Sequence, residues 1–159
     1  LSVEKPLAYI TQTTLSVDEA RDTIAALRER FPNIIGPSAG DLCYATGNRQ
    51  AAVRELCSKV DLLLIVGSSN SSNSTRLSEL GKKCGIPSYL ISSVEDLNFD
   101  WFKNVETVGL SSGASAPDIL VQGVQQAICA KFPDILVENS VTLVENLHFP
   151  LPKELQEDK

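Results

Sequence analysis

Methionine is absent from this sequence of 159 residues, and histidine occurs once, as His148. No apolar run approaches the ~20 residues that a membrane-spanning helix needs, and no signal peptide is recognisable. Lysine and arginine form no basic run and the net charge is −6, which argues against nucleic acid as a partner. The first residue is Leu1, which indicates either that processing removed the start or that the sequence is a fragment.

The four cysteines form no CxxC or CxH pair, so the sequence holds no self-contained zinc or iron–sulfur motif. Cys57 and Cys129 lie in helical patterns, where cysteine behaves as a small apolar residue. Cys84 precedes Gly85, a residue type that commonly ends helices. Cys43 differs, because it lies in the turn-like stretch GDLCYATGN. The local pattern favours an incidental thiol at Cys43 over a ligand or a nucleophile.

Apolar runs alternate with amphipathic segments along the chain, whose length fits one domain, or one plus part of a second. The segment DLLLIVG at 61–67 is apolar without alternation, which is typical of a parallel strand covered on both faces. The other predicted strands are 6–11, 87–91, 105–110, a brief one in 33–37 and an edge strand at 141–149. The predicted helices are 16–31, which opens with a capping box of Ser16 and Glu19, then 48–60, 73–85, 116–132 and a short helix with a turn at 93–102. This order predicts the α/β class, a parallel sheet with helices on both faces.

Three predicted strands run into loops rich in hydroxyl groups, with the sequences QTTLS, SSNSSNS and SSGASAP. Ligands of parallel α/β sheets bind beyond the carboxyl ends of the strands, and the N-terminus of a helix there attracts anions. Simple capping, as by Ser16 or Ser115, is one alternative, and a flexible serine-rich linker is another. Capping needs one such residue per helix, whereas residues 68–77 include eight serine, threonine and asparagine residues. The pattern therefore agrees with two interpretations, a site for a phosphate or carboxylate group and simple helix capping.

Four stretches carry a resemblance to a known family: TQTTLSVDEA, DLCYATGNRQ, GSSNSSNSTRL and SGASAPDILVQ. In this order they resemble successive signatures of the LytB family of 4-hydroxy-3-methylbut-2-enyl diphosphate reductases, and the resemblance runs from about residue 9 to the PKEL near the end. It implies three similar α/β domains around a [4Fe-4S] cluster that is held by three cysteines, one per domain. It also implies reductive dehydroxylation of the diphosphate substrate to isopentenyl and dimethylallyl diphosphates in the methylerythritol phosphate route. Ferredoxin or flavodoxin would donate the electrons.

The same resemblance assigns roles to residues in each hydroxyl-rich loop and to one cysteine. The resemblance makes Cys43 a ligand of the cluster. A cysteine in an exposed turn suits that role, because its thiolate can reach the iron. The assigned substrate-binding and catalytic residues are Ser71, Ser72, Asn73 and Ser115 for the diphosphate, Thr13 for catalysis beside the substrate hydroxyl, and Gln12 and Thr14 as its neighbours. Neutral donors suit a diphosphate, because several short hydrogen bonds can surround its oxygens.

One departure from the family pattern limits what the chain can do. The other two cluster cysteines, the substrate-contacting histidines and the acid-relay glutamate of the family lie upstream of the matched region. We therefore expect the carboxyl-terminal half of the enzyme, with the amino-terminal half as a missing partner and an incomplete set of cluster ligands. The expected parts are the end of a middle domain at 1–38, a third domain at 39–131 and a tail at 132–159.

The expected half-enzyme would be folded but inactive alone. His148 is expected to be a surface or packing residue. A non-catalytic diphosphate-binding module and a purely structural α/β domain remain the alternatives. The reduced cysteines favour the cytoplasm, with a plastid as the alternative.

Overall fold

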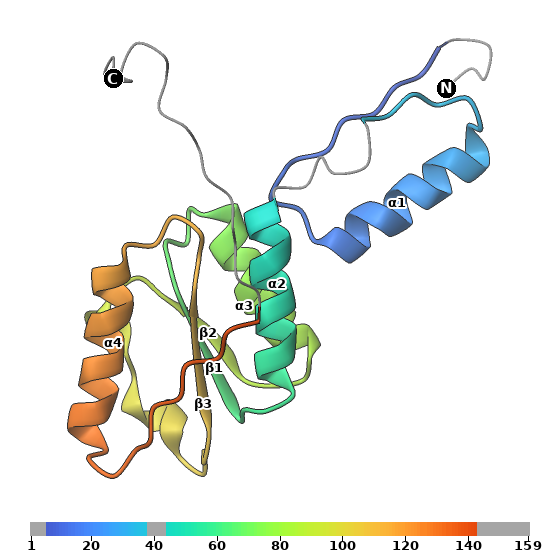
Figure 1. The fold of residues 1–159 in the computed structure, drawn as a ribbon. Coiled ribbons are helices and arrows are strands. Elements are labelled where there is room, and N and C mark those ends of the chain that lie inside the picture. The colour runs from blue at the N-terminus through green and yellow to red at the C-terminus, as the bar shows by residue number, and fades with distance from the viewer. Residues whose placement is uncertain (1–5, 38–43, 143–159) are drawn as a thin grey trace, which may run out of the picture.

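A three-stranded parallel sheet forms the centre of the molecule in the computed structural model, which describes residues 6–37 and 44–142. Its strands are β1 (Leu62–Val66), β2 (Ser88–Ile91) and β3 (Val108–Ser112). They are ordered β2-β1-β3, so β1 lies in the middle (Figure 1). The parallel α/β class predicted from the sequence is confirmed.

Both faces of β1 are buried, as its unbroken apolar sequence predicts. Leu63 and Ile65 pack on one side against α2 (Tyr44–Cys57) and α3 (Ser72–Lys83), which lie side by side (Figure 1). The alternate residues of β1 pack on the other side, where α4 (Asp118–Lys131) covers the sheet. Side chains of neighbouring strand residues point to opposite faces, so one short strand anchors two separate apolar clusters.

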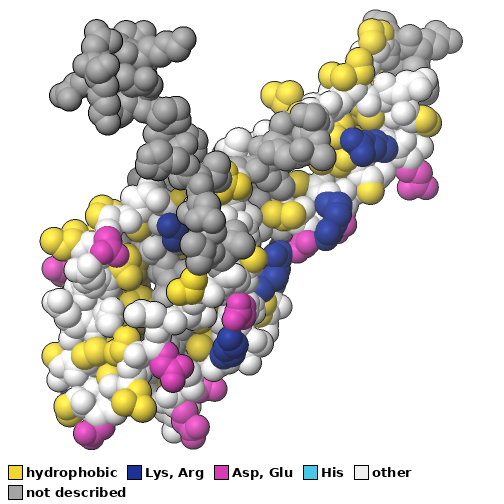
Figure 2. All heavy atoms as spheres, viewed as in Figure 1, with side chains coloured by type: hydrophobic (Ala, Val, Ile, Leu, Met, Phe, Trp, Pro, Cys, Tyr) yellow, Lys and Arg dark blue, Asp and Glu magenta, His cyan; other side chains and the backbone are white. Residues whose placement is uncertain are grey.

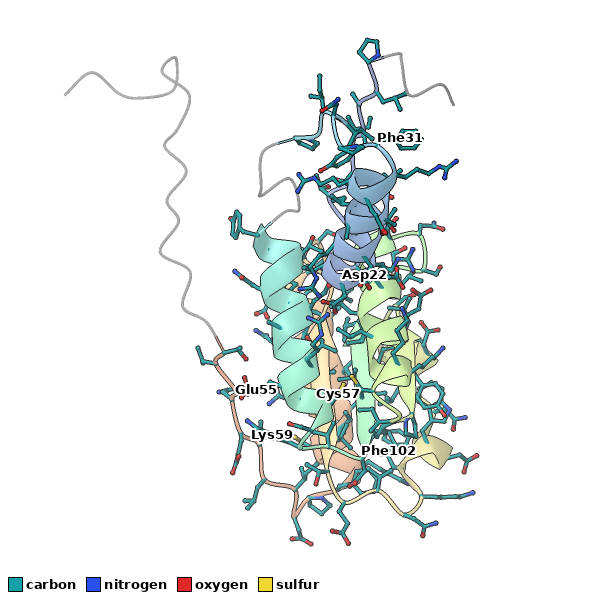
Figure 3. The ribbon with its side chains drawn as sticks, turned by 90° about the vertical axis from the view of Figure 1, so that its right-hand side faces the viewer. Asp22, Phe31, Glu55, Cys57, Lys59 and Phe102 are labelled. Carbon is teal, nitrogen blue, oxygen red and sulfur yellow. The ribbon has the colours of Figure 1, made fainter. Side chains whose placement is uncertain are left out.

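Aromatic side chains extend the core on the face that α4 covers. Two short 3-10 turns, Val94–Asp96 and Phe99–Phe102, stand where a short helix and a turn were expected. Trp101 stacks on Tyr89 of β2, with ring centroids 3.9 Å apart and planes 5° apart. The residues of these turns thereby cover the apolar cluster on the face under α4. Phe102, one of these residues, is labelled in Figure 3.

The α1 helix, Val17–Arg30, extends away from the sheet (Figure 1), but its first turn is joined to α2. The Gln50 side chain makes both joining bonds: its Oε1 accepts from Val17 N at 3.2 Å and its Nε2 donates to Leu15 O at 3.1 Å. Gln50 is buried, so these bonds are shielded from water.

The predicted capping box at the start of α1 is wrong. Ser16 occupies the N-cap position, but its side chain makes no capping hydrogen bond. Gln50 supplies an acceptor for the first helical N–H instead, and the carboxylate of Glu19 pairs with Lys83 of α3. Tertiary partners have therefore replaced the local ones that the motif predicts.

Several predicted boundaries also differ from the structure. Of the described residues in 6–11 and 33–37, only Ala8 and Ile35 form a bridge, so neither segment is a strand. The strand predicted at 105–110 begins instead at Val108, because the backbone N–H groups of residues 106 and 107 donate to the Asp61 carboxylate. The helix predicted at 48–60 runs earlier, as α2, and α4 begins two residues later than expected. The edge strand predicted at 141–149 lies mostly outside the described residues, and 141–142 are not in a strand.

None of the helices within the described part of the chain is both long and apolar enough to cross a membrane.

Candidate functional site

Two of the hydroxyl-rich loops meet at the carboxyl edge of the sheet. Val66 of β1 and Ser112 of β3 are register partners, and Gly113 N donates to Val66 O at 2.9 Å. The loop after β1 leads directly into α3, and the loop after β3 leads into α4. The sheet therefore brings two helix N-termini to one edge, as its parallel topology requires.

The serine-rich loop after β1 is a structured turn and not a linker. Ser71 is the N-cap of α3, and its Oγ accepts from Ser74 N at 3.3 Å. Earlier in the loop, Asn70 N donates to Ser68 Oγ at 3.1 Å. Capping therefore explains part of the serine content, although the Ser71 hydroxyl hydrogen stays available to a ligand.

Two polar side chains at the start of α3 are buried without a partner. Asn73 is 6% exposed and Ser74 is 1% exposed. Within residues 6–37 and 44–142, neither amide atom of Asn73 nor Oγ of Ser74 forms a hydrogen bond. A buried polar group left unpaired costs about 1–3 kcal/mol. Such a group at a helix N-terminus is suited to complete its hydrogen bonds with a bound anion.

Ser74 occupies a narrow space between the two loops. An ideal Cβ built on Gly67 would lie 2.3 Å from Ser74 Oγ, and one built on Gly113 would lie 2.1 Å from the same atom. Only glycine therefore leaves room for this side chain on both sides. Ser74 was not among the predicted site residues, although the glycines that directly follow β1 and β3 are a sequence signal of close approach.

A pocket of about 250 Å³ opens beside the serine-rich loop and reaches the first hydroxyl-rich loop. It brings together three of the predicted site residues, Gln12, Thr14 and Ser72. Leu15, Ser69, Asn70, Thr75, Arg76 and Glu79 complete the lining. Segments about 60 residues apart in sequence thus share one polar cavity.

The other predicted site residues lie around this pocket or outside the described residues. Ser71 and Asn73 flank Ser72 at the start of α3. Ser115 is exposed in the loop before α4, where Pro117 and not Ser115 is the N-cap. Thr13 is exposed in the turn that precedes α1 and does not line the pocket. Cys43 and His148 lie outside the described residues.

Two arginines lie beside these loops, and both already make contacts within the chain. Arg76 lines the pocket, and its guanidinium lies 2.8 Å from Glu79 and 3.9 Å from Glu19. Arg49 of α2 donates to the carbonyl of Ser112 at 3.2 Å. Figure 2 shows basic and acidic side chains side by side along the face that α1 and α2 present. The charge of Arg76 is therefore offset by carboxylates, whereas the partner of Arg49 is a neutral carbonyl.

The described cysteines do not fit the ligand set of an iron–sulfur cluster. No group of three or more histidine, cysteine, aspartate or glutamate side chains is placed to hold a metal within the described residues. Burial, and then the neighbouring Cys84 thiol, raise the pKa of Cys57 to about 12, so this thiol stays protonated near neutral pH, whereas cluster ligands are thiolates. Cys57 ends α2 and Cys84 caps α3, at the edge of the sheet opposite the hydroxyl-rich loops.

Comparison with known proteins gives consistent matches. The LytB protein family model matches residues 1–129. The chain is 54% identical over 153 residues to 4-hydroxy-3-methylbut-2-enyl diphosphate reductase of Zymomonas mobilis, covering 96% of this chain and 45% of that protein. It is 50% identical over 155 residues to the protein of the same name from Burkholderia pseudomallei, covering 98% and 49%.

A solved structure agrees with these relatives. The structure of E-1-hydroxy-2-methyl-but-2-enyl-4-diphosphate reductase from Plasmodium falciparum superposes with a TM-score of 0.87 at 35% identity, covering 97% of this chain and 49% of that one. The chain spans about half the length of the curated relatives it matches. Since the family model matches well over half of the chain, the chain belongs to the LytB family.

Proposed function

We propose that this chain is the carboxyl-terminal half of a 4-hydroxy-3-methylbut-2-enyl diphosphate reductase and that its hydroxyl-rich loops bind the substrate diphosphate. The names of its relatives and its coverage of about half of each support the proposal. The whole enzyme would remove the substrate hydroxyl as water, with two electrons and two protons, and release isopentenyl and dimethylallyl diphosphates.

The proposal extends to the division of the chain and to its compartment. Residues 1–38 would end a middle domain, 39–131 would form a third domain and 132–159 a tail. The parallel sheet with α2, α3 and α4 falls within the proposed third domain, which supports a boundary near the start of α2. The cytoplasm is the proposed compartment.

The single observation that carries the proposal is the buried amide of Asn73. It has no hydrogen-bond partner within the described residues and stands in the first turn of α3, beside Ser71 and Ser72. Diphosphate oxygens accept hydrogen bonds, so they can take the Nδ2 hydrogens, the serine hydroxyl hydrogens and the free N–H groups of the helix. The helix dipole adds partial positive charge at the same place. Ser115 would complete the cradle from the loop after β3, which adjoins α3 through Gly113 and Ser74.

The residues of the first loop would act at the other end of the substrate. Gln12 and Thr14 share a pocket with Ser72, which supports a ligand spanning both loops. In this arrangement Thr13, exposed in the same turn, would contact the substrate hydroxyl and help to hold the proton that leaves with it.

The iron–sulfur cluster would supply the electrons when it is bound, and ferredoxin or flavodoxin would reduce it. Cys43 would be one ligand, and no other cysteine of the chain has a matching role. A four-iron cluster needs about three or four cysteine ligands. The isolated chain should therefore be inactive, and reductase turnover after iron and sulfide loading would contradict this expectation.

Calorimetric titration of the chain with inorganic pyrophosphate tests the binding site. We expect weak binding that Ser72→Ala lowers and Asn73→Asp lowers by at least about tenfold, since a carboxylate removes the donor and repels the anion. Asn104→Asp makes the same charge change near the opposite edge of the sheet and should leave binding unchanged. Equal affinity of the Asn73→Asp variant and the original chain, or the absence of binding at millimolar pyrophosphate, would reject the site.

A further inference from the structure

Two cysteine thiols meet at the edge of the sheet opposite the proposed site. The α2 and α3 helices lie side by side on one face of the sheet, α2 leading into β1 and α3 leaving it, so both helices end at the amino edge of the strands (Figure 1). Cys57 is the last residue of α2 and Cys84 caps α3. The side chains of Cys57 and Cys84 interact there, and this interaction contributes to the raised pKa of Cys57.

The two thiols differ in their access to solvent. Cys57 is partly buried and packs on the apolar cluster that α2 and α3 form with the sheet; Figure 3 labels it there. Cys84 is exposed. Cys129 lies on α4, which covers the opposite face. A partly buried thiol beside an exposed one is the arrangement in which a small reagent can react at one sulfur and the second sulfur can then displace it.

We propose that Cys57 and Cys84 are a redox-sensitive pair that forms a reversible intrachain disulfide by exchange with a low-molecular-weight disulfide such as oxidised glutathione. Neither thiol has a role in the proposed diphosphate site, and neither belongs to a metal-binding group within the described residues.

The exchange proceeds in two balanced steps. In the first, the Cys84 thiolate attacks one sulfur of the glutathione disulfide, whose S–S bond breaks, and one glutathione leaves as a thiolate. In the second, the Cys57 thiolate attacks the Cys84 sulfur of this mixed disulfide, and the second glutathione leaves as a thiolate. The two protons of the protein thiols end on the two released glutathiones. The protein loses two electrons, and one glutathione disulfide gains them.

The order of the two steps follows from the surroundings of each sulfur. Cys84 is exposed, and the cationic side chains of Lys82 and Lys83 precede it, which attracts the glutathione carboxylates to this sulfur. Burial, followed by the Cys84 thiol, raises the pKa of Cys57 to about 12, so Cys57 is a poor first nucleophile. Once Cys84 carries glutathione, Cys57 is the neighbouring thiol that can attack the mixed disulfide. Cys57 is therefore suited to the second step.

Peptide mapping of the unaltered chain tests the pair without any substitution. Cleavage after lysine and arginine places the four cysteines in four different peptides: 31–49, 55–59, 84–103 and 104–131. The folded chain is incubated with oxidised glutathione, quenched with acid and N-ethylmaleimide, and digested without reductant. We expect a linked species of 55–59 and 84–103 that forms at the same rate when the protein is diluted and that dithiothreitol reverses.

Serine variants then separate the two steps. Cys57→Ser should trap glutathione on Cys84, and Cys84→Ser should leave residue 57 unmodified over the same time. Cys129→Ser is the matched control and should give the same linked species as the original chain. A stable mixed disulfide on Cys84 of the original chain, or linkage of 84–103 to 31–49 or 104–131 in equal yield, would overturn the proposal.

Discussion

Adding one methyl group at Gly113 should destabilise the fold through a single contact. The new Cβ would lie 2.1 Å from Ser74 Oγ, far inside van der Waals contact, but 3.3 Å from Ser74 Cβ, which is only tight. Ser74 is buried, so its hydroxyl has no open space to turn into. Overpacking of this kind costs about 1–3 kcal/mol, and Gly113→Ala should lower the free energy of unfolding by that amount.

The hydroxyl of Ser74 should account for most of this cost. Ser74→Ala removes a buried group that has no partner within the described residues, so alone it should change stability by less than about 1 kcal/mol. The double variant Ser74→Ala, Gly113→Ala should recover most of what Gly113→Ala loses. Gly67→Ala is the contrasting case, because its Cβ would also lie 2.7 Å from Ser74 Cβ. Ser74→Ala keeps that carbon and should rescue Gly67→Ala much less.

Urea unfolding followed by tryptophan fluorescence measures all of these variants. Trp101 is the only tryptophan, and it is stacked on Tyr89 in the core, so its emission reports on loss of the fold. The coupling free energy between positions 74 and 113 is the decisive quantity. If the costs of Gly113→Ala and Ser74→Ala simply add, the hydroxyl is not the obstacle and the proposed packing of the two loops is wrong.

Two further predictions concern polar contacts outside the proposed site. Asp61→Ala should cost about 1–2 kcal/mol in urea unfolding, because the carboxylate accepts from two backbone N–H groups just before β3, at 3.0 and 2.9 Å, and Asp61→Asn should cost less. The hydrogen bond from Lys83, then its charge, lowers the pKa of Glu19, so the contribution of this pair to stability should be complete above about pH 4.3 and lost as the pH falls through the lowered value. In the Glu19→Gln variant, the free energy of unfolding should therefore depend less on pH in this acidic range. An unchanged pH dependence would contradict the stabilising role of the Glu19–Lys83 pair.

The sheet was predictable because β1 has a continuous apolar sequence. The residues at 62–66 are all apolar, which predicts burial on both faces, and the surrounding helical patterns supplied the two layers that cover them. The segment at 6–11 has a similar apolar character but forms only one bridge, at Ala8. Apolar content marks what can be buried, whereas a strand also needs a neighbouring strand to take its hydrogen bonds.

The candidate site was predictable only in part. Hydroxyl-rich loops after parallel strands left an anion site open, and the resemblance to the LytB family then singled out Ser71, Ser72 and Asn73, which lie at the start of α3. The burial of Asn73 could not be read from a motif, because it depends on how closely the loops after β1 and β3 approach each other. Ser74 was missed for the same reason, since its constraint comes from two glycines on other segments.

Charge balance in the pocket explains why this chain alone should bind a diphosphate weakly. Arg76 is the cation of the pocket, and two carboxylates already lie within 4 Å of it. A diphosphate must therefore compete with Glu79 for the guanidinium or bind through neutral donors and helix ends, whose influence water and salt reduce. Glu79→Gln would free Arg76 from its nearest carboxylate and remove one negative charge from the pocket, and we expect it to strengthen pyrophosphate binding and to steepen its salt dependence. Unchanged binding in the Glu79→Gln variant would mean that the anion lies beyond the reach of Arg76, nearer to Ser115 and the N-terminus of α4.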